Sequence, residues 1–344
     1  MRGDRASELL QKTAGRRVLL VGDLMMDEWV FGNVSRISPE APIPVVTMPL
    51  TPDARADKPG GAGNVAAILL SLGASVRVVG VTGDDDFGRR LRADLEARGA
   101  DVSSVLADPS RPTTHKLRIL AGRQQLLRID TESDEPLASD TSRRLQDAIR
   151  AGLDQADVVL VSDYAKGVVS EASLPGSLIA DARAAEIPFC ADPKPANIDL
   201  FRGAALVSPN ESEALQAAGP AANAGAPHAH TRSLPPAVAA AGRALRERLD
   251  AGAVFITRGD RGIAVFGPDD HVTEVPAATG SGDVGDGTGC GDAVSATSAL
   301  ALAAGASAIE AAQIANAAGG VVSRFVGVHS PSAQEILDWL RGAR

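Results

Sequence analysis

The strongest constraint on the fold is an alternation between short apolar runs and helix-like segments. Runs such as RRVLLVGD (residues 16–23), SVRVVGVTG (75–83) and ADVVLVSDY (156–164) are predominantly apolar rather than apolar at every second position. Such runs are typical of strands that are buried on both faces of a sheet. Because helical patterns separate them, the sequence predicts an α/β fold with a mostly parallel central sheet covered by helices on both sides.

Two segments interrupt this alternation. SRISPEAPIPVVTM (35–48) mixes prolines with apolar residues, which excludes a central strand and favours an edge strand. TTHKLRILAGRQQLLRID (113–130) has two β-type stretches around Ala121-Gly122, which predicts a hairpin. We expect lid segments at about 34–48 and 113–130 to form a small sheet that projects from the main body. No linker is evident, so we expect residues 1–344 to form a single domain.

Composition and charge argue against several classes of binding partner. The net charge is −9, and the chain has one Tyr and two Trp residues, which argues against a nucleic-acid partner. No run approaches the ~20 apolar residues of a membrane helix, so no membrane partner is expected. The first 17 residues lack a signal-peptide core, and two cysteines suggest no disulfide framework. These features favour a cytoplasmic protein.

Polar residues stand where several of the expected strands end. Ligands of open α/β sheets bind beyond the carboxyl ends of the strands. We therefore expect the functional site among the residues at those ends, which are Asp23, Asp27, Asp163, Asp192, Lys194, Asn210, Glu213 and Arg258.

The stretch GDGTGCGDA (285–293) lies immediately before an apolar helical pattern. Glycines let successive backbone N–H groups converge at a helix N-terminus, so Gly289, Cys290 and Gly291 are expected to form an anion hole. A carboxylate beside such a hole would repel a phosphate unless it removes a proton from an attacking hydroxyl. Asp292 is therefore a candidate general base, and the alternative is that it merely caps the helix. The spacing and lysine of a P-loop are absent.

Six motifs in this order carry a resemblance to a known family: PGGAGNVA (59–66), GDDDFG (83–88), NESE (210–213), TRG (257–259), DGTGCGD (286–292) and ANAAGG (315–320). The chain resembles the ribokinase-like (PfkB) carbohydrate kinases. The resemblance implies a ribokinase-like three-layer sandwich with a β lid. It also implies an ATP-dependent phosphotransferase with an alcohol group as acceptor.

Further stretches are similar to one branch of this family, the kinase of D-glycero-D-manno-heptose 7-phosphate. These are GDLMMDEWVFGNVSRISPEAPIPVV (22–46), LRID (127–130), SDYAKG (162–167) and DPK (192–194). The branch phosphorylates the anomeric hydroxyl to give the 1,7-bisphosphate, a lipopolysaccharide precursor. The H-x-G-H motif of a fused adenylyltransferase is absent, so the chain resembles the stand-alone kinase. The alternatives are another sugar or nucleoside kinase of the family and, more remotely, a silent nucleotide- or sugar-binding protein.

The resemblance also implies roles for individual residues. Asp292 would be the base, with Gly289, Cys290 and Gly291 as the anion hole. The sugar phosphate would contact Asp27, Gly60, Gly61, Asn64, Lys194, Arg118 and Arg128, and ATP would contact Asn210, Glu213, Thr257, Gly259 and Asn316. Glu213 would hold Mg²⁺ through water; activation by K⁺ is left open. A homodimer through the lid is expected.

Several of these residues also fit purely structural roles. Asn210 and Glu213 also fit a capping box, Lys194 also fits a pair with a structural acid, and Arg118 and Arg128 also fit a solvated lid face. Cys290 and Gly287 depart from the family pattern, and the Ala/Pro-rich segment 217–238 is longer than the resemblance implies.

Overall fold

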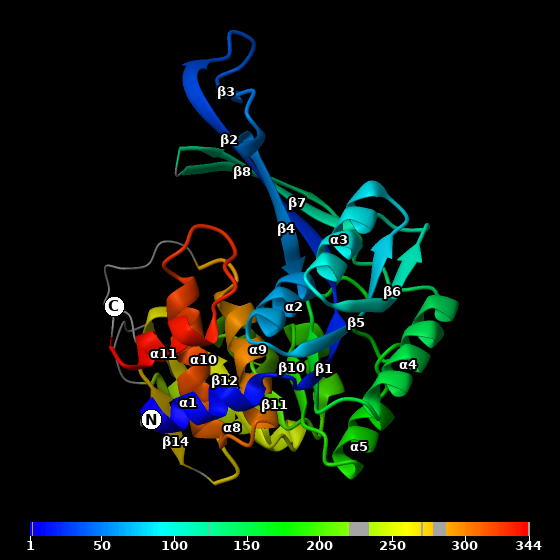
Figure 1. The fold of residues 1–344 in the computed structure, drawn as a ribbon, viewed down its shortest axis with the longest axis vertical. Helices are drawn as coiled ribbons and strands as arrows, with labels where there is room; N and C mark the ends of the chain where they lie inside the picture. The colour runs from blue at the N-terminus through cyan, green and yellow to red at the C-terminus, as the bar shows by residue number, and fades with distance from the viewer. Residues whose placement is uncertain (2, 123, 220–233, 270, 278–286, 343–344) are drawn as a thin grey trace.

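The computed structural model describes residues 1, 3–122, 124–219, 234–269, 271–277 and 287–342. Within these ranges, nine strands form a central sheet in the order β14-β13-β12-β11-β10-β9-β1-β5-β6 (Figure 1). The strands are β1 (Arg17–Gly22), β5 (Ser75–Gly83), β6 (Asp101–Asp108), β9 (Val158–Ser162), β10 (Phe189–Asp192), β11 (Leu206–Val207), β12 (Ala253–Thr257), β13 (Ile263–Phe266) and β14 (Val272–Val275). The sheet is parallel from β6 to β12, and β13 and β14 complete it as an antiparallel edge.

The strands are apolar on both faces because helices cover both sides of the sheet. In β1, Val18 and Leu20 belong to one hydrophobic cluster, whereas Leu19 and Val21 belong to another. Side chains alternate between the two faces of a strand, so each cluster occupies one side of the sheet. The continuous apolar runs in the sequence therefore have a direct structural cause.

The first cluster is formed with α1 (Gly3–Thr13), α2 (Ala62–Ser71), α3 (Asp86–Ala97), α9 (Cys290–Ala303), α10 (Ala308–Val322) and α11 (Ala333–Leu340). The second is formed with α4 (Ser139–Leu153), α5 (Gly176–Ala184), α6 (Glu211–Ala218) and α8 (Pro236–Leu249). Short 3-10 turns span Pro52–Ala54, Pro195–Phe201 and Gly259–Arg261. The predicted three-layer α/β architecture is confirmed.

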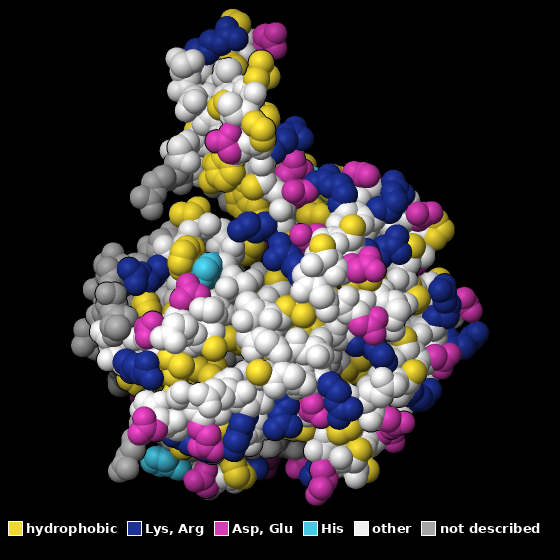
Figure 2. Space-filling model, viewed as in Figure 1, with side chains coloured by type: hydrophobic (Ala, Val, Ile, Leu, Met, Phe, Trp, Pro, Cys, Tyr) yellow, Lys and Arg dark blue, Asp and Glu magenta, His cyan; other side chains and the backbone are white. Residues whose placement is uncertain are grey.

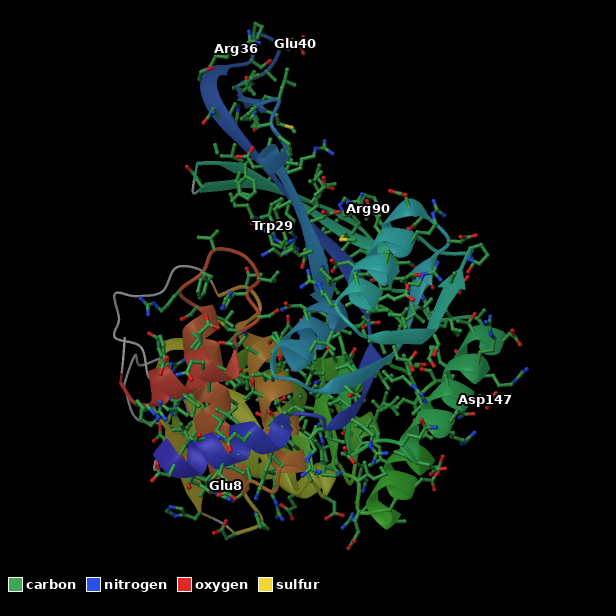
Figure 3. All side chains as sticks on the ribbon, viewed as in Figure 1. Glu8, Trp29, Arg36, Glu40, Arg90 and Asp147 are labelled. Atoms are coloured by element: carbon green, nitrogen blue, oxygen red, sulfur yellow. The ribbon has the colours of Figure 1, made fainter. Side chains whose placement is uncertain are left out.

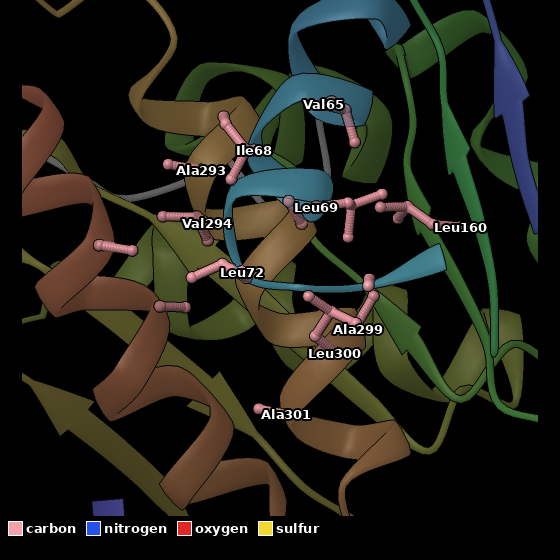
Figure 4. Packing of buried hydrophobic residues seen from close by; sticks show 14 of the residues in the cluster. Val65, Ile68, Leu69, Leu72, Leu160, Ala293, Val294, Ala299, Leu300 and Ala301 are labelled. Atoms are coloured by element: carbon pink, nitrogen blue, oxygen red, sulfur yellow. The ribbon is translucent and has the colours of Figure 1, made fainter. Parts of the chain in front are cut away.

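Helices α2 and α9 pack against each other in the first layer. Figure 4 shows Ile68 and Leu69 of α2 beside Ala293, Val294 and Leu300 of α9. The small alanines that are common in α9 allow the two helices to approach closely. This packing brings the first turn of α9 next to the first turn of α2, which is where the candidate site lies.

A second sheet projects from the body (Figure 1). Its strands are β2 (Leu24–Ile37), β3 (Pro44–Thr47), β4 (Arg55–Gly61), β7 (Thr114–Ala121) and β8 (Gln124–Thr131), and their order is β3-β2-β7-β8. The fifth strand, β4, pairs with the first half of β2 on the edge opposite β7. We call these five strands the projecting sheet. Both expected lid segments, 34–48 and 113–130, fall within it, and the expected hairpin turns at Gly122, whose φ is +60°.

The outer part of the projecting sheet is apolar and exposed. β2 is buried from Leu24 to Val30 and largely exposed beyond that point. Figure 3 shows Trp29 at the base of the sheet and Arg36 and Glu40 at its tip. In the space-filling view the projection stands clear of the body with apolar side chains along it (Figure 2). Most of the large apolar side chains that stay exposed among the described residues lie in β2 and β8 or in the segments that flank β3, namely Val34, Ile37, Ile43, Met48, Leu50, Leu127 and Ile129.

Across the described ranges, no helix combines the length and the apolarity needed to cross a bilayer. The Ala/Pro-rich segment singled out in the sequence, 217–238, lies mostly outside the described residues, which omit 220–233.

Candidate functional site

Asp292 lies in the first turn of α9 and is only 6% exposed. The helix begins after Gly289, which adopts a left-handed φ of +80°. The Asp292 Oδ2 atom accepts a hydrogen bond from Asn64 Nδ2 (2.6 Å), and its Oδ1 atom accepts one from the Tyr164 hydroxyl (2.5 Å). No side-chain cap is formed at this helix terminus. The carboxylate therefore faces other segments of the chain and does not act as a helix cap.

Burial raises the pKa of the Asp292 carboxyl to about 6, although the hydrogen bonds from Tyr164 and Asn64 favour the ionised form. A nearby carboxylate, Asp27, raises the pKa further, and Lys194 lowers it. A carboxylate with this pKa is mostly ionised at neutral pH, yet it is more basic than an exposed aspartate. This combination suits a general base.

The first turn of α9 offers backbone N–H groups to an anion. The first N–H groups of a helix have no intrahelical acceptor and carry partial positive charge. Here the N–H of Cys290 already donates to Gly287 O (3.2 Å), so the N–H groups that this turn can offer to an anion are those of Gly291 and Asp292. A Cβ atom added at Gly291 would meet nothing within 4 Å, so the space above this turn is open. The geometry fits an anion that approaches the backbone closely.

Two cavities meet at this turn. One, of about 120 Å³, contains Asp292 and Gly289 together with Tyr164, Asp192, Lys194, Ser208, Asn210 and Glu213. The other, of about 230 Å³, includes Gly259, Gly287, Cys290, Asn316 and Gly319. Thr257 and Gly291 line both cavities. The predicted nucleotide-side residues therefore surround one continuous region that ends at Asp292.

Glu213 has two contacts, one with each carboxylate oxygen. Oε2 accepts from the Asn210 backbone N–H (2.9 Å), and the Asn210 side chain accepts from the Glu213 N–H, which completes a capping box at α6. Oε1 lies 2.5 Å from the ammonium of Lys194. The capping box that was the structural alternative for Asn210 and Glu213 is thus present, and Oε1, the carboxylate oxygen that takes no part in it, is paired with Lys194.

This arrangement fits Mg²⁺ better than a metal held by protein ligands alone. Within the described part of the chain, no group of three or more His, Cys, Asp or Glu side chains could hold a metal ion. Mg²⁺ is usually bound by one or two carboxylates, several waters and substrate phosphates. Glu213 provides such a carboxylate, and that of Asp192 lines the same cavity.

The remaining sugar-side residues lie at the base of the projecting sheet. Asp27 of β2 is 5% exposed, and its Oδ1 atom accepts from Arg118 Nη1 of β7 (2.5 Å). A Cβ atom at Gly60 would lie 2.2 Å from Asp27 Oδ2, so β4 passes directly against this carboxylate. Gly61, with φ of +55°, turns the chain from β4 into α2, which carries Asn64. Asp27, Arg118, Gly60 and Asn64 are thus brought together.

Three further residues form hydrogen bonds with other parts of the chain. Arg128 lies opposite Arg118 in the β7–β8 pair, but its guanidinium donates to Asp130 (2.9 Å) and its side chain is half exposed. Asn316 lines the larger cavity while its amide donates to Pro276 O (2.9 Å). Arg258, expected near the site, is buried, and its Nη1 atom donates to Glu274 (2.7 Å).

Sequence reasoning did not single out Tyr164 as a site residue. Its hydroxyl contacts Asp292, and the Lys194 ammonium lies 5.3 Å above its ring centroid. Two local signals were available: Tyr164 follows closely on the strand that ends at Ser162, and it lies within the stretch SDYAKG (162–167). The contact itself joins residues 128 positions apart, which no local pattern reports.

Comparison with known proteins agrees with this geometry. Residues 18–335 match the family model of the pfkB family carbohydrate kinases. The bifunctional protein HldE of Geobacter sulfurreducens is 40% identical over 319 residues, which is 93% of this chain and 62% of that protein. The chain thus spans less than two thirds of the length of this relative.

Solved structures share the fold at lower identity. Ribokinase from Arabidopsis thaliana, complexed with ribose and ATP, superposes with a TM-score of 0.69 at 19% identity, covering 95% of this chain and 99% of that one. Phosphofructokinase-2 from Escherichia coli, with substrates and products, gives 0.74 at 20%, covering 96% and 100%. The ribokinase-like fold predicted from the sequence is confirmed. The chain belongs to the pfkB family of carbohydrate kinases.

Proposed function

We propose that the protein is an ATP-dependent kinase that phosphorylates the anomeric hydroxyl of D-glycero-D-manno-heptose 7-phosphate to the 1,7-bisphosphate. The observation that carries a kinase function is the buried Asp292 carboxylate at the open first turn of α9, between the 120 Å³ and 230 Å³ cavities. The heptose phosphate is inferred from the resemblance of residues 22–46, 127–130, 162–167 and 192–194 to that branch.

In the proposed reaction, Asp292 accepts the proton of the anomeric hydroxyl as its oxygen attacks the γ-phosphorus of ATP. The new P–O bond forms as the bond from the γ-phosphorus to the bridging oxygen breaks, and ADP leaves. The first-turn N–H groups of α9 would stabilise the charge that develops on the transferred phosphoryl oxygens. Mg²⁺, held at Glu213, would neutralise phosphate charge.

Asp27 and Arg118 would orient the sugar. Arg118 and Arg128 are assigned to the phosphate of the sugar, because a guanidinium can contact a phosphate through two N–H groups. Each is held by a carboxylate in the structure, Asp27 and Asp130 respectively. Lys194, paired with Glu213, would reach the phosphates of ATP or of the sugar.

The projecting sheet is proposed to act as a lid and to pair with the same sheet of a second copy. The exposed apolar side chains on its outer half support this pairing, because large apolar surfaces on a monomer usually mark an interaction site. The single-domain organisation, the cytoplasmic location and any activation by K⁺ belong to the same proposal.

The test is ADP release from Mg·ATP with five acceptors: D-glycero-D-manno-heptose 7-phosphate, sedoheptulose 7-phosphate, fructose 6-phosphate, ribose and adenosine, each with and without K⁺. Turnover confined to the heptose phosphate, with phosphorus NMR showing a new anomeric phosphate, is the expected result. Turnover on another acceptor would replace the heptose by that sugar or nucleoside. ATP binding without turnover on any acceptor would favour a silent binding protein.

Glu213→Gln isolates the metal role of this residue from its capping role. Glutamine can serve in a capping box, so α6 keeps its N-terminal hydrogen bonds while the charge is lost. We expect the Mg²⁺ concentration that gives half-maximal activity to rise by about 10-fold or more, measured by titrating Mg²⁺ at saturating ATP. The matched control is Glu310→Gln, which occupies the same capping-box position in α10. Equal Mg²⁺ requirements in both variants would show that Glu213 only caps its helix.

A further inference from the structure

The loop that follows β9 is held by two buried carboxylates. Asp23 accepts hydrogen bonds from the backbone N–H groups of Tyr164 (2.7 Å), Lys166 (3.1 Å) and Val168 (3.1 Å). Asp163 accepts from the N–H of Ala165 (2.8 Å), a residue with a positive φ of 54°. The backbone on both sides of Tyr164 is therefore fixed independently of its side chain.

This fixed backbone directs the only tyrosine of the chain at Asp292. The hydroxyl contacts Oδ1, while Asn64 of α2 contacts Oδ2 from another segment. An ionised carboxylate has about four lone-pair directions, so two donors leave two directions open. A carboxylate held through both oxygens cannot rotate without breaking a hydrogen bond.

We propose that Tyr164 is a positioning residue of phosphoryl transfer: its hydroxyl holds the Asp292 carboxylate so that a free lone pair faces the sugar hydroxyl. The inference rests on the proposed function, because it assigns Tyr164 a part in the same reaction. Tyr164 itself exchanges no proton with the substrate. Positioning of this kind matters because proton transfer requires the base within hydrogen-bond reach of the reacting hydroxyl.

The charges around Asp292 show why this donor matters. Asp27 from β2, itself paired with Arg118, is negative, whereas Lys194, paired with Glu213 of α6, is positive. Burial raises the pKa of Asp192, at the end of β10, to about 7, so this carboxyl is largely protonated at pH 6. Asp27 and burial thus disfavour the ionised base. The Tyr164 hydroxyl favours it, and burial together with Asp292 raises the pKa of Tyr164 well above its usual value, so the hydroxyl stays a donor.

The first test is Tyr164→Phe, which keeps the ring beneath Lys194 and removes only the hydroxyl. A hydrogen bond to a charged group is lost, so the acidic limb of the kcat profile is expected to move up by about one pH unit. At pH 6 this shift alone is expected to lower kcat by about 5-fold relative to wild type. A smaller loss is expected to persist at pH 9, where the base is ionised in both proteins but is no longer held in place by the hydroxyl, while KM for ATP stays unchanged. Equal kcat of the two proteins at pH 9, or an acidic limb that does not move, would overturn the proposal.

A graded variant strengthens this test. Because the chain contains one tyrosine, growth on 3-fluorotyrosine labels position 164 alone. Fluorine makes the phenol a stronger donor, so the acidic limb should move below that of wild type, opposite to the shift in Tyr164→Phe. A shift in the same direction as in Tyr164→Phe would contradict the assigned role.

The same label gives a readout that needs no turnover. The single fluorine resonance is expected to titrate with an inflection near pH 6 as Asp292 is protonated, and Asp292→Asn should abolish that inflection. A fluorine chemical shift that does not change with pH, or that titrates identically in Asp292→Asn, would show that Tyr164 does not contact Asp292. If wild type phosphorylates no acceptor, the proposed function fails, and the fluorine titration still decides whether Tyr164 senses Asp292.

Discussion

Asp292→Asn is expected to lower kcat by about 10³-fold, within the range that general-base catalysis supplies, and to leave the fold intact. The asparagine oxygen can accept from Asn64 and its amide can donate to the Tyr164 oxygen, so both hydrogen bonds survive in altered form. The variant should bind ATP and sugar with wild-type affinity. Single-turnover kinetics and calorimetry separate these two quantities.

The same substitution is expected to raise stability at neutral pH. The folded-state pKa of Asp292, about 6, lies above the ordinary value of 3.8, so its ionisation weakens the folded state as pH rises from about 4 to 6. The contribution is favourable below that window and is lost above it. At pH 8 the free energy of unfolding should therefore be on the order of 1–2 kcal/mol higher in Asp292→Asn than in wild type.

The control is Asp86→Asn, the same change in the first turn of α3, where the side chain is exposed. It should change neither kcat nor stability by more than a few tenths of a kcal/mol. If Asp292→Asn kept wild-type turnover, or if both variants lost it equally, the general-base assignment would be wrong.

Gly60→Ala is expected to raise KM for the sugar by about 10–100-fold, the equivalent of losing one hydrogen bond between charged groups. The added Cβ would lie 2.2 Å from Asp27 Oδ2 and 2.8 Å from its Cγ, so Asp27 must move away from Arg118. Nucleotide affinity should not change, because the larger cavity is lined by other segments. Steady-state kinetics with varied sugar, together with calorimetric ATP binding, check both expectations.

Gly176→Ala is the matched control, since a Cβ atom there meets nothing within 4 Å at the start of α5. It should leave both constants at wild-type values. An unchanged sugar KM in Gly60→Ala would mean that Asp27 does not bind the sugar.

Sequence patterns predicted the body of the fold well because each buried strand carries its own signal. The residues of β1 and β9 are apolar whatever their partners are, so the continuous apolar runs alone identified these strands. The sequence did not predict β4, because most residues of this strand, RADKPGG, are polar or strand-breaking. It is a strand only because β2 pairs with it, and an edge position tolerates its proline.

The same distinction applies to the candidate site, where residues close in the sequence could be predicted together and residues far apart could not. Asp292 and its glycine turn lie within nine consecutive residues, so their proximity is visible in the sequence. The Asp27–Arg118 pair depends on the register of β2 with β7, which no local motif encodes. Tyr164 was missed for the same reason, whereas Arg258 was expected near the site because buried salt bridges and catalytic cations look alike at strand ends.

The three groups at the centre of the site come from distant parts of the chain. Asn64 and Asp292 are 228 positions apart, and Tyr164 and Asp292 are 128 apart. Closing such long loops is slow and costs entropy, so these contacts form late in folding. During synthesis on the ribosome, the strands of the projecting sheet, which we propose to contact the sugar, can assemble long before residue 292 emerges. Turnover therefore reports the completion of folding, and a nascent or nicked chain that holds its secondary structure lacks the arrangement that would consume ATP.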